Sequence, residues 1–120
     1  MTPDEREKLV RSYLGKTVKI LIDRPIGYVH TKGEKTLVYP INYGYIPGVL
    51  GGDGEELDVY LLGVTEPVTE YVCRIAGIVF RHNDVEDKLI GVPENTDFTV
   101  EEMENAVRFQ EKYYDSYIEI

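Results

Sequence analysis

Hydrophobic and polar positions alternate with a period of two along several short stretches of the chain. In residues 16–22, Val18, Ile20 and Ile22 share one face, which predicts a half-buried β-strand. Further strands are predicted at residues 27–30, 35–38, 57–62, 71–80 and 88–92. Lys32-Gly33 is a plausible hairpin turn. Residues 39–54, rich in Pro, Gly, Tyr and Asn, are predicted to form an ordered loop, and residues 117–120 an extended end.

The spacing of apolar residues becomes helical near both ends of the chain. Thr2, Pro3 and Glu5 form the pattern of a capping box, which predicts a short helix that ends near Gly15. Thr99 and Glu102 repeat the capping box, and one apolar face follows it, made of Val100, Met103, Ala106, Val107 and Tyr114. Short strands with a late helix predict a mainly β fold with some α: a small, mostly antiparallel barrel with one or two packed helices.

Length and charge narrow the classes of protein. A chain of 120 residues suits one compact domain, which we expect to span residues 1–120. Acidic residues outnumber basic ones by 22 to 13, giving a net charge of −9. Nucleic acids and anionic membranes need a basic patch, so both are disfavoured as partners, whereas divalent cations are compatible with this charge.

Cysteine content and the N-terminal segment indicate the compartment. Cys73 is the single cysteine and lies in an apolar run, so no intramolecular disulfide can form and we expect it to pack in the core. Neither a signal peptide nor an apolar run of membrane-spanning length is visible, so we expect a cytoplasmic protein. His30 and His82 lack partners at catalytic or zinc spacing and are predicted in surface or loop positions.

The densest chemistry lies in GGDGEELD, residues 51–58. In a regular strand Asp53 and Glu55 share a face while Asp58 points to the opposite one, but a glycine-permitted curl can bring the three together. Packed carboxylates repel one another unless a cation neutralises them, and Mg²⁺ needs two or three such oxygen ligands. Taken alone, such a motif is more often a solvated acidic turn between strands.

A second acidic segment, NDVEDK, occupies residues 83–88 between two predicted strands. Alone it describes an ordinary polar hairpin loop. Two acidic loops at strand ends in one small domain favour a paired-metal site that activates water and holds phosphoryl oxygens.

The segment YPINYGYIP (residues 39–47), followed by DGEELDV (53–59), resembles the soluble inorganic pyrophosphatases, as do residues 77–79, KLIGVP (88–93) and residues 109–113. The resemblance implies a five-stranded barrel of OB-like topology, Mg²⁺-dependent hydrolysis of inorganic diphosphate, and homo-oligomers as a frequent state.

The resemblance also implies roles for individual residues. The metal ligands would be Asp53, Glu55, Asp58, Asp84 and either Glu86 or Asp87. Glu55 would accept the proton of the attacking water, with Tyr43 hydrogen-bonded near that water. Lys88 and Tyr113 would contact phosphate.

Several positions depart from the family pattern, among them Asp23, which stands where the family often has an active-site Glu. Glu55 stands where the family has Asp, and Tyr114 stands where it has a phosphate-binding Lys. The candidates for the family's phosphate-binding cations near residues 25–38 are Arg24, Lys32 and Lys35, and Arg81 is a candidate to compensate for a lost cation. A phosphohydrolase for another phosphorylated substrate and a non-catalytic metal- or phosphate-binding homologue remain as alternatives.

Overall fold

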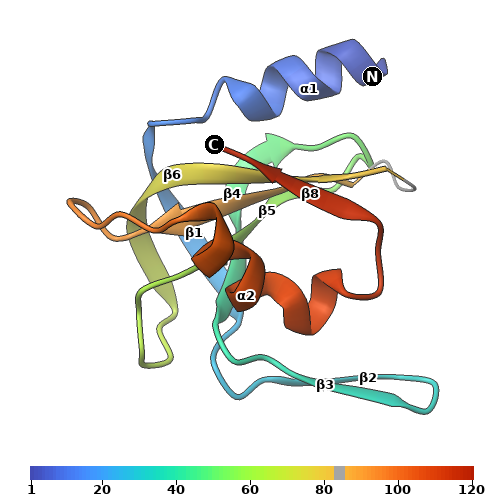
Figure 1. The fold of residues 1–120 in the computed structure, drawn as a ribbon, viewed down its shortest axis with the longest axis vertical. Coiled ribbons are helices and arrows are strands. Elements are labelled where there is room, and N and C mark those ends of the chain that lie inside the picture. The colour runs from blue at the N-terminus through green and yellow to red at the C-terminus, as the bar shows by residue number, and fades with distance from the viewer. Residues whose placement is uncertain (83–85) are drawn as a thin grey trace.

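The computed structural model of the chain describes residues 1–82 and 86–120. Within them lie two helices and eight strands: α1 (Pro3–Arg11), β1 (Thr17–Arg24), β2 (Val29–Lys32), β3 (Lys35–Val38), β4 (Asn42–Leu50), β5 (Glu56–Leu61), β6 (Glu70–Arg81), β7 (Lys88–Val92), α2 (Val100–Glu111) and β8 (Ser116–Glu119). Figure 1 shows α1 and α2 on different sides of one curved sheet. Among the described residues, neither helix has the length and apolar character needed to cross a membrane.

Five strands close into a barrel in the order β1-β4-β5-β7-β6, and a β1–β6 pairing completes the ring. The pairing of β5 with β7 is parallel, whereas the other described pairings within the barrel are antiparallel. The long strand β6 pairs with β1 along its first half and with β8 along its second half. The predicted mainly β fold with a small five-stranded OB-like barrel is therefore confirmed.

Both predicted helix starts are confirmed by reciprocal capping boxes. The Thr2 hydroxyl accepts from the Glu5 amide at 3.2 Å, and the Thr99 hydroxyl accepts from the Glu102 amide at 3.1 Å. The first helix ends at Arg11 rather than near Gly15. The Gly15 amide instead donates to the carbonyl of Ile75 at 2.8 Å, because the chain has already turned to join the barrel.

The prediction of a loop over residues 39–54 is wrong, because Asn42–Leu50 forms strand β4. This strand pairs with β1 on one side and β5 on the other. Gly44 lies opposite Ile22, where an added Cβ would come within 1.9 Å of the Leu21 carbonyl oxygen. The glycine that weakened the sequence signal for a strand is thus what allows the two backbones to approach.

The buried side chains form two clusters. Successive residues of β5 alternate between them: Val59 packs in the cluster that includes Val10 of α1, and Tyr60 in the cluster that includes Met103 of α2. Cys73 is fully buried in the first cluster, as predicted. Tyr114, predicted on the apolar face of the late helix, lies beyond the end of α2 and is 37% exposed.

Strands β2 and β3 form a separate two-stranded sheet. Gly33, with φ of 63°, lies in the turn that joins them. Figure 1 shows this hairpin projecting from the barrel below α2. The hairpin thereby supplies one wall of a cavity.

Candidate active site

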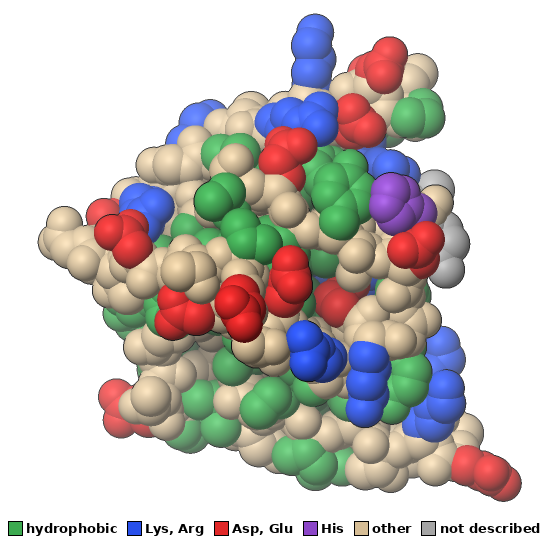
Figure 2. Space-filling model, viewed as in Figure 1, with side chains coloured by type: hydrophobic (Ala, Val, Ile, Leu, Met, Phe, Trp, Pro, Cys, Tyr) green, Lys and Arg blue, Asp and Glu red, His purple; other side chains and the backbone are tan. Residues whose placement is uncertain are grey.

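A cavity of about 750 Å³ lies between the hairpin, the barrel and the C-terminal end of α2. Its charged lining residues are Asp23, Arg24, Lys32, Glu34, Lys35, Asp58, Arg81, Glu86 and Lys88. Basic groups thus slightly outnumber acidic ones here, although the whole chain carries a net charge of −9. Figure 2 shows Lys and Arg side chains gathered where the hairpin meets the end of α2. The cavity can therefore bind an anion, even though the protein as a whole is acidic.

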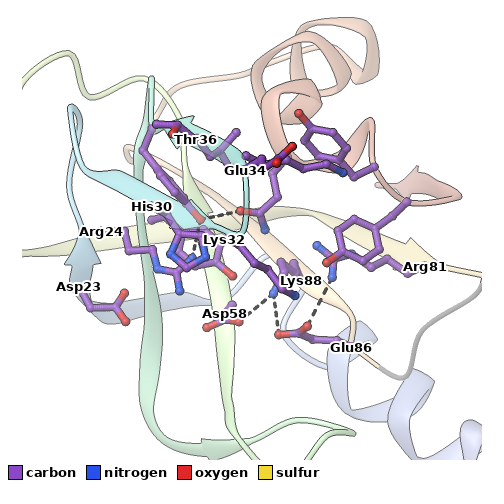
Figure 3. Close-up of a pocket in the computed structure, with 17 residues that line it drawn as sticks. Asp23, Arg24, His30, Lys32, Glu34, Thr36, Asp58, Arg81, Glu86 and Lys88 are labelled. Carbon is purple, nitrogen blue, oxygen red and sulfur yellow. Dashed lines mark hydrogen bonds and ion pairs between the residues drawn. The ribbon is translucent and has the colours of Figure 1, made fainter.

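Lys88 joins two carboxylates on the cavity floor. Its Nζ lies 2.8 Å from Asp58 Oδ2 and 2.8 Å from Glu86 Oε1 (Figure 3). The parallel register of β5 and β7 pairs Val59 with Leu89, so the residues before them, Asp58 within β5 and Lys88 at the start of β7, lie side by side. Sheet register, rather than nearness in sequence, therefore assembles this cluster.

The two carboxylates of the cluster differ in acidity. Burial raises the pKa of Asp58, and the charge of Lys88 offsets this only in part. Burial acts in the same direction on Glu86, but Lys88 and Arg81 outweigh it, so the pKa of Glu86 lies below its ordinary value. The two directions differ because Glu86, unlike Asp58, also lies close to Arg81.

Tyr43 lies beside this cluster and hydrogen-bonds Asp58. Its ring is 5% exposed, and Lys88 Nζ lies 5.4 Å from the ring centroid. Burial, followed by the charge of Asp58, raises the pKa of the Tyr43 hydroxyl well above its ordinary value. The hydroxyl therefore stays protonated near neutral pH and acts as a hydrogen-bond donor.

Arg81 is held at the cavity edge by the end of α2. Its Nε and Nη2 donate to the two carboxylate oxygens of Glu111 at 3.0 and 2.6 Å, and Tyr60 donates to the same carboxylate at 2.5 Å. Arg81 also lies 3.4 Å from Glu86 and stacks over the Tyr114 ring at 3.6 Å. Burial acts to lower the pKa of Arg81, but Glu111 outweighs burial and the pKa is raised.

We expect Glu111→Gln to destabilise the fold by about 3 kcal/mol, because it leaves a buried guanidinium without its main counter-charge. Arg81 is 2% and Glu111 6% exposed, so solvent screens this pair poorly. Urea unfolding followed by circular dichroism measures the effect. Glu104→Gln, on the exposed side of the same helix, is the matched control and should leave stability nearly unchanged. Equal stabilities of the two variants would contradict the prediction.

The predicted metal ligands are not all brought together. Asp53 and Glu55 are exposed in the turn before β5, where Asp53 Oδ1 accepts from the Glu55 amide at 3.0 Å, and neither lines the cavity. Asp84 lies outside the described residues. Among the residues that are described, no group of three or more His, Cys, Asp or Glu side chains is arranged to hold a metal ion. The structure instead pairs Asp58 with Glu86, and the metal roles of Asp53, Glu55 and Asp84 stay predictions.

Asp87 does not line the cavity either. Its side chain is 1% exposed and lies 2.8 Å from Arg6 Nε of α1. Burial raises the pKa of Asp87, and Arg6 offsets this in part. Of the two alternatives Glu86 and Asp87, it is Glu86 that reaches the cavity.

The predicted phosphate contacts all reach the cavity. Lys35 Nζ lies 4.6 Å from the Tyr113 ring centroid, and both residues line the cavity with Arg81 and Lys88. His30, predicted in a surface or loop position, lies on β2 and lines the cavity.

Sequence reasoning named Arg24 as a candidate phosphate-binding cation but missed the polar chain that it starts in the cavity wall. Arg24 Nη1 donates to Tyr39 Oη, which donates to Gln110 Oε1, each at 2.6 Å. It also missed Glu111. The helical spacing that identified Met103 and Val107 extends to Glu111, so continuing that face would have found it.

Comparisons with known proteins point to one family. The sequence model described as inorganic pyrophosphatase matches residues 12–119. The inorganic pyrophosphatase of Saccharolobus solfataricus is 34% identical over 99 residues, covering 78% of this chain and 58% of that protein. That of Caulobacter vibrioides is 32% identical over 89 residues, covering 66% and 48%. The chain thus spans about half the length of the curated relatives it matches.

The fold is similar to solved structures as well. An inorganic pyrophosphatase structure from Ehrlichia chaffeensis superimposes with a TM-score of 0.64 at 23% identity, covering 88% of this chain and 86% of that one. One from Coxiella burnetii gives a TM-score of 0.63 at 20% identity, covering 88% and 84%.

Proposed function

This chain belongs to the inorganic pyrophosphatase family, and on that basis we propose that it hydrolyses inorganic diphosphate to two phosphates with the help of Mg²⁺. The observation that carries the proposal is the cluster of Asp58, Lys88 and Glu86 in a cavity whose basic side chains slightly outnumber its acidic ones. Such a cluster offers carboxylates for a metal ion and an ammonium for phosphate in the same place.

The cations of the cavity are proposed to hold the substrate. Lys88 turns from its carboxylates to a phosphoryl oxygen, and Lys35 with Tyr113 contacts the other phosphate from the hairpin side. Arg81 is fixed by Glu111, so it offers a positioned guanidinium at the cavity edge. Because diphosphate is a compact polyanion, convergent charged donors bind it more strongly than neutral ones do.

Asp58 and Glu86 fit a divalent cation. Both carboxylates already converge on one positive charge, the ammonium of Lys88. Mg²⁺ commonly takes one or two protein carboxylates and completes its coordination with water and substrate phosphate. When bound, it would supply a Lewis acid that neutralises phosphoryl charge and lowers the pKa of water.

The residues proposed to handle the proton are Tyr43 and a carboxylate. Tyr43 stays protonated and donates, so it orients an oxygen beside Asp58. The family resemblance assigns proton acceptance to Glu55. Asp58 is a second candidate because it lies inside the cavity and burial raises its pKa.

A related function is favoured by the size and lining of the cavity. Its volume of about 750 Å³ suits a ligand larger than diphosphate itself. The exposed rings of Tyr113 and Tyr114 stand at its edge, where an organic group attached to a diphosphate would find an apolar surface. The second candidate is therefore hydrolysis of an organic diphosphate.

A substrate panel in Mg²⁺ separates these functions. Phosphate release is measured from inorganic diphosphate, a nucleoside diphosphate and a simple phosphomonoester at equal concentrations. We expect inorganic diphosphate to be hydrolysed fastest. Faster release from the nucleoside diphosphate would favour the second candidate, and no release from any of them would favour a binding protein that keeps the fold.

A further inference from the structure

The first helix of the chain reaches the segment that carries Glu86 and Lys88. Arg6 of α1 lies 2.8 Å from Asp87, between those two cavity residues in sequence. The family model matches residues 12–119, so α1, which spans Pro3–Arg11, lies outside the matched region. A helix outside the region that the family model matches therefore contacts Asp87, the residue between Glu86 and Lys88 of the candidate active site.

The contact is a buried one. The side chain of Asp87 is 1% exposed and that of Arg6 17% exposed. Neither carboxylate oxygen of Asp87 has a hydrogen-bond partner among the described residues, so the ion pair with Arg6 is its close charged contact. This ion pair thus joins α1 to the segment that leads into β7. A buried carboxylate that loses its partner is strongly unfavourable, so this tie holds the segment in one arrangement.

The arrangement of the segment explains how Arg6 can act on the cavity. In extended backbone, successive side chains point to opposite sides. Glu86 and Lys88 face the cavity, whereas Asp87 faces α1. In Figure 3 the pale blue helix α1 lies beside Glu86 on the side away from the hairpin. When Arg6 holds the Asp87 side chain toward α1, the side chains of Glu86 and Lys88 are therefore held toward the cavity.

We propose that Arg6 is a positioning residue that acts through Asp87 to hold Glu86 and Lys88 in the cavity. Asp87 then serves as the anchor of this segment rather than as a metal ligand. The expected effect on kcat rests on the proposed function, whereas the expected effect on amide exchange in the segment does not. Loss of Arg6 should loosen the segment whether or not diphosphate is the substrate.

The chain offers a matched control on the same helix. Arg11 also fastens α1 to the barrel, through hydrogen bonds of 2.7 and 3.0 Å to Glu119 of β8. The partners of Arg11 among the described residues are Glu7, Glu119 and the Phe80 ring, none of which lines the cavity. Comparing the two arginines separates attachment of α1 in general from the contact with Asp87.

The test compares Arg6→Met, Arg6→Lys and Arg11→Met with the wild-type chain. Amide hydrogen exchange is followed across the strand that begins at Lys88, and kcat and KM for inorganic diphosphate are measured in Mg²⁺. We expect Arg6→Met to speed exchange in that strand and to lower kcat by about 10-fold or more, since displacements near 1 Å cost up to about 100-fold. Arg6→Lys should recover part of both, and Arg11→Met should change neither appreciably.

Each outcome bears on one of the two proposals. Equal effects of Arg6→Met and Arg11→Met, or unchanged exchange and kcat in Arg6→Met, would overturn the positioning role. If Asp87→Asn loses activity while Arg6→Met keeps it, the positioning role is contradicted and Asp87 is a metal ligand, as the family resemblance implies. If the wild-type chain releases no phosphate but Arg6→Met alone loosens the strand, the proposed function fails and the positioning contact stands.

Discussion

Replacing Asp58 by Asn should lower the turnover of inorganic diphosphate by about 10²–10³-fold, the usual effect of removing one preorganised electrostatic group from an active site. Two neighbours depend on its charge: Lys88 pairs with it at 2.8 Å and Tyr43 hydrogen-bonds it. The proposed cation would be a third, shared with Glu86. The amide keeps the shape of the side chain but offers neither the charge nor a second acceptor oxygen.

The measurement is steady-state phosphate release, with circular dichroism to establish that the variant is folded. Glu56→Gln is the control, because Glu56 lies two residues earlier on the same strand, accepts from the Gly48 amide at 2.8 Å and does not line the cavity. It should retain near wild-type turnover. A folded Asp58→Asn variant with full activity would show that the cluster takes no part in the mechanism. Loss of turnover in Glu55→Gln alone would identify Glu55 as the group that accepts the proton of the attacking water.

Gly44→Ala should destabilise the barrel by about 3 kcal/mol or more, at the upper end of the effects of overpacking. A Cβ at this position would lie 1.9 Å from the Leu21 carbonyl oxygen and 2.9 Å from Ile22 Cα. Both are backbone atoms, so no side-chain rotation relieves the clash and β4 must separate from β1. For a typical domain with about 5–15 kcal/mol of total stability, this is a large fraction.

Urea unfolding compares Gly44→Ala with Gly51→Ala. A Cβ at Gly51 would have its nearest neighbour at 3.5 Å, an ordinary contact, so this variant should shift the unfolding midpoint little. Gly48→Ala should fall between them, because its open surroundings leave only the strain of φ at 78°. Similar midpoints for Gly44→Ala and Gly51→Ala would show that β1 and β4 are not paired as closely as described.

The helices and strands could be predicted where neighbouring residues alone determine them. The capping boxes at Thr2 and Thr99 and the run that became β7 need only neighbouring residues, and each was recovered. Strand β4 was missed because Gly44 and Pro47 argue against a strand when taken alone. This segment is a strand because it pairs with β1 and β5 and because Gly44 lets its backbone approach β1 closely. Both are tertiary contacts, which the local sequence does not reveal.

Some residues of the candidate site could likewise be predicted from sequence motifs, whereas others are identified only by the packed fold. Asp58, Lys88 and Tyr43 lie where a cavity forms, and each belongs to a motif that can be read from the sequence. Asp53 and Glu55 are near Asp58 in sequence but remain in the exposed turn, because nearness along the chain does not decide which side chains converge. The contact of Arg6 with Asp87 joins residues far apart in the chain, and only the packed fold places them together.

The central claim is tested most directly by measuring phosphate release from inorganic diphosphate by the wild-type chain in Mg²⁺, with and without EDTA. We expect release in Mg²⁺, its loss in EDTA, and its recovery when excess Mg²⁺ is restored. Absence of release from a folded protein, or release that EDTA does not change, would contradict a metal-dependent diphosphate hydrolase built on Asp58, Glu86 and Lys88.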